Sequence, residues 1–217
     1  MRDLEKAFWG KITASVTHEI KNTYAIIQES SGLLSDLLTL QPEGSLIHKE
    51  KFQRVLDTIN NQVNRGVILA TRLNQFAHSM DEPWTEVKMA DLLELAVSLL
   101  QRLVRRREIE LKAATPEADL SIRSNPFRLL LILDSVIERL PEVLKPGGQI
   151  VLQSSPAPEG LAILLEVQGP KQAGWEGFLE QFFPSLKDFL EAVGAELAIS
   201  SPPTPEGVIL TIKTSGE

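Results

Sequence analysis

The sequence contains no cysteine among its 217 residues, which excludes disulfides, thiol catalysis and cysteine-based zinc sites. Long apolar runs are also missing, because the longest strongly apolar run, Leu129 to Leu133, is far too short to span a bilayer. The opening Met-Arg-Asp-Leu-Glu-Lys is polar and lacks the apolar stretch of a signal peptide. These absences predict a cytoplasmic protein with no membrane partner.

The sequence also has fewer basic than acidic residues. The chain has 22 Lys and Arg against 29 Asp and Glu, a formal net charge of −7, and the acidic excess lies mostly in the second half. Nucleic-acid binding needs a basic face to neutralise phosphates. The one basic cluster, Arg105-Arg106-Arg107, is better explained as the solvated end of a helix. We therefore expect no nucleic-acid partner.

Two long helices are expected in the first 80 residues, separated by the Pro- and Gly-containing break Gln41–Ser45. In each segment, residues spaced by three and four form a single stripe on a helical wheel. Each stripe has more apolar edge than one partner helix covers, so we expect the hairpin to dimerise into a four-helix bundle. The two predicted stripes are Ile12, Val16, Ile20, Thr23, Ile27, Leu34, Leu37 and Leu38, and then Phe52, Leu56, Ile59, Val63, Gly66, Ala70, Leu73 and Ala77.

Asp81-Glu82-Pro83 interrupts the helical pattern and predicts a domain boundary, with a helical domain at 1–82 and a second domain at 83–217. Helix-like and strand-like segments alternate in the second domain, as in an α/β sandwich with one sheet covered on one face by helices. The predicted fold class is therefore α+β: an antiparallel two-helix hairpin forming a dimeric four-helix bundle, followed by an α/β sandwich. The expected helices are 89–106, 126–144 and 177–193, and the expected strands are 109–112, 120–123, 149–154, 161–167, 196–200 and 208–214.

His18 lies on the side of the first helix opposite the apolar stripe. At roughly 100° per residue it points about 160° away from the centre of the stripe, so the imidazole is expected to face water. One turn back, Ala14 and Ser15 are small and leave the ring open to a large partner, while Lys21 flanks it one turn forward. We therefore predict that Ala14, Ser15 and Lys21 contact a binding partner.

Two polar residues beside His18 are candidates for a chemical role. Glu19 could accept a hydrogen bond from one ring nitrogen, fixing the tautomer and leaving the other nitrogen as a nucleophile. Asn22, one turn on, could position water or phosphoryl oxygens. Such an arrangement suits phosphoryl transfer. An ordinary surface histidine is the alternative, whereas a His-Glu-x-x-His zinc site is excluded because position 22 is Asn22.

The segment Ser15–Asn22 resembles the phosphoacceptor H-box of sensor histidine kinases, whose usual form is His-Glu-(Ile/Leu)-Lys-Asn-Pro. Three further segments are similar to that family in the right order. Ala70–Ala77 resembles the end of its second dimerisation helix, Asn125–Leu129 the Asp-Pro-x-Arg-Leu opening of a helix in the ATP domain, and Gly147–Val151 the strand entry Gly-Gly-x-Ile. The resemblance implies a phosphoacceptor hairpin bearing His18, followed by a domain similar to the histidine-kinase ATPase domain.

The departures from the family pattern concern ATP. Two family asparagines, the second of which helps to hold Mg²⁺, are matched by Ser135 and Arg139. The Asp-x-Gly-x-Gly box that binds adenine reads Val167-Gln168-Gly169-Pro170-Lys171, and the Gly-x-Gly-Leu phosphate loop reads Phe183-Pro184-Ser185-Leu186. Phosphate cradles need glycine because the backbone must approach the phosphate closely. We therefore expect a degenerate ATPase domain and no bound cofactor. One departure lies next to the H-box, where Thr23 replaces the usual proline, and a straighter first helix is expected.

The leading hypothesis is a histidine phosphotransferase of a two-component phosphorelay. It would exchange a phosphoryl group between His18 and response-regulator aspartates, with Glu19 and Asn22 assisting. Mg²⁺ would come with the receiver domain of the partner, and the chain would act as a homodimer. Two alternatives stay open: a non-catalytic scaffold that docks a response regulator or a kinase, and a response-regulator phosphatase in which Asn22 orients the attacking water.

Overall fold

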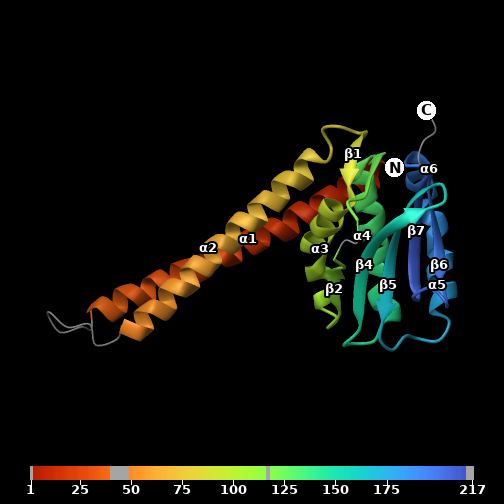
Figure 1. Ribbon diagram of the computed structural model, residues 1–217. Coiled ribbons are helices and arrows are strands. Elements are labelled where there is room, and N and C mark those ends of the chain that lie inside the picture. The colour runs from red at the N-terminus through yellow and green to blue at the C-terminus, as the bar shows by residue number, and fades with distance from the viewer. Residues whose placement is uncertain (1, 40–48, 116–117, 214–217) are drawn as a thin grey trace. The chain divides into compact units, whose positions relative to one another are not determined.

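The computed structural model describes residues 2–39, 49–115 and 118–213, which divide into two compact units (Figure 1). The helical unit is Lys6–Gln75, and the second unit combines Met1–Glu5 with Phe76–Glu217. The boundary predicted at residues 82 and 83 falls inside the second unit. The reason is Phe76, which is fully buried and whose ring lies 5.9 Å from that of Phe127. The predicted break at 41–45 lies outside the described residues.

The helical unit is an antiparallel hairpin of α1 (Arg2–Thr39) and α2 (Lys49–His78), which lie side by side (Figure 1). In α2, a series of less exposed residues recurs at alternating steps of three and four, the spacing of a two-helix contact. They are Phe52, Val55, Ile59, Gln62, Gly66, Leu69 and Leu73. No helix formed by the described residues has both the length and the apolar character needed to cross a membrane.

This spacing corrects the stripe predicted for α2. Leu56 and Val63 remain 43% and 46% exposed, and Ala70 is exposed too. The prediction therefore merged two faces of one helix: a face turned toward α1, and a second apolar face that the hairpin leaves uncovered.

The second unit alternates strands and helices. In chain order its elements are β1 (Thr85–Lys88), α3 (Met89–Arg105), β2 (Glu110–Ala113), β3 (Ser121–Ser124), α4 (Pro126–Val143), β4 (Gln149–Ala157), β5 (Gly160–Gln168), α5 (Trp175–Phe182), the 3₁₀ turn η1 (Phe183–Leu186), α6 (Lys187–Ala192), β6 (Ala195–Ser200) and β7 (Gly207–Lys213).

A five-stranded mixed sheet, in the order β2-β4-β5-β7-β6, forms the frame of this unit (Figure 1). Only the β2–β4 pair is parallel. Helix α3 packs on β2 and β4, α5 and α6 pack on β6, and α4 contacts both α3 and α6. The predicted α+β class, a helical hairpin followed by an α/β sandwich, is confirmed.

Two details differ from the predicted elements. β1 was not predicted; it pairs with β3 in a separate two-stranded sheet. The helix predicted over 177–193 is divided into α5, η1 and α6. Pro184 lies at the start of η1, where its missing N–H cannot support a continuous α-helix.

Helix α4 bears two of the positions that depart from the family pattern, and its start is well defined. The Asn125 side chain caps it by accepting a hydrogen bond from the backbone N–H of Arg128 at 2.9 Å, and Pro126 occupies the first turn. Most of the helix is buried, including the run Leu129–Leu133. The cap and the buried core therefore fix the rotation of α4 and the direction of its remaining side chains.

Candidate functional site

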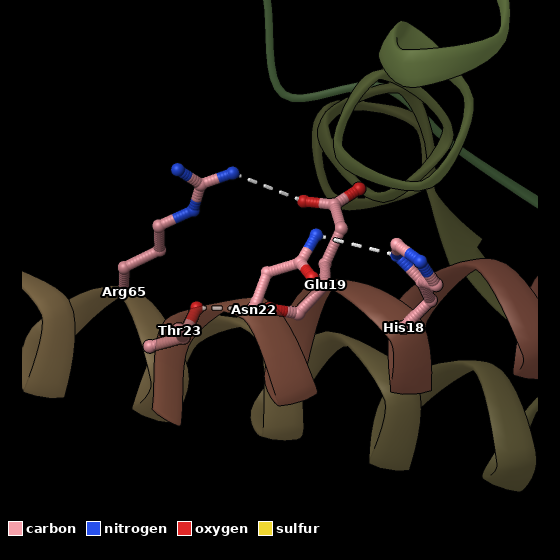
Figure 2. A network of polar contacts seen from close by, with 5 residues as sticks. All are labelled: His18, Glu19, Asn22, Thr23 and Arg65. Carbon is pink, nitrogen blue, oxygen red and sulfur yellow. Dashed lines mark hydrogen bonds and ion pairs between the residues drawn. The ribbon is translucent and has the colours of Figure 1, made fainter. Parts of the chain in front are cut away.

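His18 lies in the middle of α1 and is exposed, as the helical wheel predicts. Its Nδ1 lies 3.3 Å from Nδ2 of Asn22, one turn further along the helix (Figure 2). Residues four apart on a helix face each other, whereas adjacent residues do not. An amide nitrogen can only donate, so Nδ1 accepts this hydrogen bond. The structure therefore makes Asn22 a neighbour of the ring itself.

The Glu19 carboxylate is directed toward α2. Its Oε2 forms an ion pair with Nη2 of Arg65 at 3.2 Å (Figure 2). The Glu19 side chain is 20% exposed and that of Arg65 is 55% exposed. The expected hydrogen bond from the ring to Glu19 is thus replaced by one from Asn22, because the carboxylate pairs with an opposite charge across the hairpin.

Thr23, in the place of the family proline, brings the two helices close at this level. It is 2% exposed, and its hydroxyl donates to the Glu19 carbonyl at 3.0 Å. Its methyl group would lie 3.5 Å from a Cβ added to Gly66 on α2. Arg65 precedes Gly66, so this approach sets Arg65 opposite Glu19. Helix α1 continues unbroken through Thr23.

The three predicted partner contacts all lie on α1 near His18. Ala14 and Lys21 are exposed, and Ser15 is half-buried. Between them, the hydroxyl of Thr17 donates back to the carbonyl of Thr13 at 2.7 Å. The part of this surface nearest the imidazole is therefore made of small side chains, with one cation beside it.

Arg65 is the site residue that the sequence did not reveal. It lies 46 positions from Glu19, and their pairing depends on the register between α1 and α2. Only the small residue Gly66 beside it hints at a close approach of two helices. A hydrophobic pattern cannot fix that register, because several shifts between two amphipathic helices keep apolar residues in contact.

In the second unit, a cavity of about 600 Å³ is lined by three of the departing positions, Ser135, Arg139 and Ser185, together with Phe182 and Leu186. The Ser135 hydroxyl donates to the Leu131 carbonyl of its own helix at 2.8 Å. The Arg139 guanidinium lies 5.0 Å from the centre of the Phe182 ring and pairs with Glu142 at 3.1 Å. Both side chains are thus engaged within the protein.

Two further departing positions, Val167 and Lys171, are engaged too. Val167 is buried in β5. Lys171 pairs with Glu206 at 2.5 Å, and its Nζ lies 5.7 Å from the centre of the Trp175 ring. Its side chain is only 15% exposed, so this lysine forms part of the packing at the end of β5.

The one glycine retained in that box has a structural reason to be there. Gly169 has φ +110°, a conformation that side chains rarely adopt, and an added Cβ would lie 3.1 Å from Cα of Gly148. The two glycines therefore allow two backbone segments to meet, and no ligand is needed to explain them.

No protein-family model matches the sequence, and no curated protein matches it. Several solved structures of histidine kinases are similar to it. ThkA, solved in complex with the response regulator protein TrrA, is 20% identical with a TM-score of 0.48; the match covers 99% of this chain but only 64% of that one. The Acinetobacter baumannii histidine kinase AdeS is 12% identical with a TM-score of 0.48, covering 92% of this chain and 98% of that one. A histidine kinase from Burkholderia phymatum STM815 is 13% identical with a TM-score of 0.46, covering 96% and 98% respectively. At these identities and TM-scores the likeness assigns neither a family nor an activity to this chain.

Proposed function

We propose that this chain is a histidine phosphotransferase of a two-component phosphorelay. It accepts a phosphoryl group on His18 from an aspartyl phosphate of a response-regulator receiver domain and passes it to a second receiver, without using ATP. One observation supports this most strongly: His18 is exposed on a helical hairpin with Nδ1 engaged by Asn22, while the positions that match the nucleotide-binding boxes are engaged in contacts within the protein.

The transfer is a displacement at phosphorus. Nε2, the ring nitrogen farther from the helix backbone, forms a bond to phosphorus. The bond between phosphorus and the aspartyl oxygen breaks, and the aspartate leaves with the electron pair. The reverse reaction donates the group to another aspartate. Attack requires the Nε2 lone pair, so the ring proton must then lie on Nδ1.

The surface around the imidazole suits a receiver domain as the donor. Ala14 is exposed and small, so a large partner can approach the ring closely. Lys21 is exposed and offers a cation to the acidic site that holds an aspartyl phosphate. Among the described residues no group of three His, Asp or Glu could hold a metal ion, and we expect Mg²⁺ to arrive with the receiver.

The proposal excludes autophosphorylation from ATP. Arg139 places a guanidinium, paired with Glu142, where the family has the asparagine that helps to hold Mg²⁺, and a guanidinium has no lone pair with which to ligate a cation. Val167 offers no hydrogen-bond acceptor where an aspartate would receive the adenine amino group. The proposed donor is therefore the aspartyl phosphate of a receiver domain.

A response-regulator phosphatase is the second candidate, and the exposed Asn22 amide favours it. An amide beside the imidazole could orient water toward an aspartyl phosphate in the partner. A scaffold that only docks a regulator would need neither His18 nor Asn22. The three functions differ in which of these two side chains they require.

The test is to mix the protein with radiolabelled phosphorylated receivers from the same genome. Phosphotransfer predicts acid-labile label on His18 and its passage to a second receiver. Loss of label from the receiver with release of inorganic phosphate, in a His18→Ala variant as much as in the native protein, would show a phosphatase. Stable binding with no loss of label would show a scaffold.

A further inference from the structure

The contact between Asn22 and His18 has a consequence for the ring proton. Because the Asn22 Nδ2 donates to Nδ1 at 3.3 Å, Nδ1 is unprotonated in this arrangement, and the proton of the neutral ring lies on Nε2. That tautomer cannot attack through Nε2, since the lone pair of that nitrogen is occupied by a proton. The site at rest is thus in its less reactive form.

The Glu19 carboxylate, which could favour the tautomer with the proton on Nδ1, is paired with another residue. A carboxylate only accepts hydrogen bonds, so a carboxylate at Nδ1 would require the proton there. The carboxylate next to the ring, that of Glu19, is paired with Arg65 at 3.2 Å (Figure 2). At Nδ1 itself, the neighbouring group is the neutral amide of Asn22.

An amide can serve both tautomers. Its nitrogen donates and its oxygen accepts, so a half-turn of the Asn22 side chain replaces Nδ2 by Oδ1 at the ring. Asn22 is exposed, and His18 is the partner that the described residues supply to its amide. The rotation therefore costs few contacts.

We propose that Asn22 is a positioning residue that sets the tautomer of His18, donating to Nδ1 at rest and accepting from Nδ1–H during phosphoryl transfer. The inference rests on the proposed function for its second half only. As Nε2 forms its bond to phosphorus and the aspartate leaves, the proton stays on Nδ1, where Oδ1 of Asn22 stabilises the charge that develops on the ring.

The first experiment needs no phosphoryl donor. The full chain is labelled with ¹⁵N in its histidines, and the two ring nitrogens of His18 are observed by NMR at a pH where the ring is neutral. The native protein is expected to hold the proton mainly on Nε2. Asn22→Asp, which can only accept, should raise the ratio of the Nδ1–H to the Nε2–H form about fivefold or more, the factor that one net hydrogen bond gives.

The matched control is Asn61→Asp, which adds the same charge at an exposed position of α2 and should leave the tautomer unchanged. An unchanged tautomer in Asn22→Asp would overturn the proposal, as would an equal change in Asn61→Asp. These results do not depend on whether His18 accepts phosphate, so they test the inference even if the proposed function fails.

The second experiment is single-turnover transfer from a phosphorylated receiver. Asn22→Ala loses both hydrogen bonds and should lower the rate constant at saturation about fivefold to tenfold, with the half-saturating receiver concentration unchanged. Asn22→Asp should recover most of that rate, because it accepts from Nδ1–H. A loss as large in Asn22→Asp as in Asn22→Ala would contradict the role in transfer. Absence of label on His18 in the native protein would instead reject the proposed function.

Discussion

At the scale of single residues, the His18 imidazole is predicted to act through its chemistry and to add little to stability. We expect His18→Ala to abolish acceptance of phosphate, because a phosphoramidate needs a nitrogen nucleophile and the ammonium of the nearby Lys21 is no substitute. The ring is exposed, so the free energy of unfolding should change by no more than about 0.5 kcal/mol. Denaturant unfolding and labelling with a phosphorylated receiver measure the two effects separately. Retained labelling would move the acceptor to another residue.

Steric access around His18 gives a second prediction at this scale. Ala14 is small and exposed one turn before the histidine, so Ala14→Trp should block a receiver domain and slow transfer at least tenfold. Lys171→Met, in the second unit, is the control: Lys171 pairs with Glu206, and transfer should stay nearly unchanged. Equal losses in the two variants would indicate that the second unit takes part in the chemistry.

The residues around His18 also show where sequence reasoning stops. The exposure of His18 follows from helical periodicity alone, because the stripe fixes which side of α1 is buried. The neighbour of the ring follows from the same spacing, because residues four apart face each other on a helix and adjacent residues do not, which places Asn22 and not Glu19 at the imidazole. The partner of Glu19 does not follow from the sequence. Arg65 depends on the register of two helices, which a one-dimensional pattern leaves open.

At the scale of elements, close approaches of the backbone decide which glycines matter. Gly207, at the start of β7, pairs with Glu166 of β5, and an added Cβ would lie 2.1 Å from the Leu165 carbonyl oxygen. Gly207→Ala should therefore displace β7, which lies between β5 and β6, and destabilise the protein by roughly 3 kcal/mol or more.

The control for this prediction is Gly177, inside α5, where an added Cβ meets nothing within 4 Å. Gly177→Ala should stabilise the protein by about 0.5–1 kcal/mol, since alanine loses less backbone entropy in a helix. Chemical denaturation of both variants provides the comparison. A Gly207→Ala protein as stable as the native chain would show that β5 and β7 adapt to the extra group.

The order of elements can be predicted largely from the sequence. Two features of the fold cannot: the strand β1 and the division of the helix expected over 177–193. The strand β1 is short, and it depends on its pairing with β3 and on the burial of Val87. The division of the helix over 177–193 is caused by Pro184 at the start of η1. For β1, pairing with a distant strand outweighs the local sequence preference. For the helix over 177–193, the missing N–H of proline outweighs the helical pattern.

At the scale of the whole molecule, we predict that the protein does not bind Mg-ATP at physiological concentrations. Arg139 and Phe182 stack across the cavity of the second unit, and Arg139 also pairs with Glu142. A nucleotide would have to displace these contacts and bring Mg²⁺ beside a cation. Isothermal calorimetry should show no heat of binding up to millimolar Mg-ATP, with Mg²⁺ alone as the control. A micromolar dissociation constant for Mg-ATP would contradict the prediction and favour an ATP-dependent kinase.

The last prediction concerns the uncovered apolar face of the hairpin, which we propose pairs with a second copy of this chain. Leu56, Val63, Val67 and Ala70 are exposed and lie on one side of α2, at steps of seven, four and three residues. Val67 is 60% exposed, an unfavourable arrangement for a helix that the hairpin already packs along its other face. A second hairpin placed against this stripe forms a four-helix bundle and removes that surface from water.

Light scattering at micromolar concentration should therefore give about twice the chain mass of 24.1 kDa. Val63→Glu places a charge within the proposed interface, where it cannot keep its hydration, and should yield monomers. Asn61→Glu adds the same charge roughly 200° around the helix from Val63 and should remain dimeric. If the native chain is a monomer, or if both variants dissociate equally, the exposed stripe has a different partner and phosphotransfer must be explained on a single hairpin.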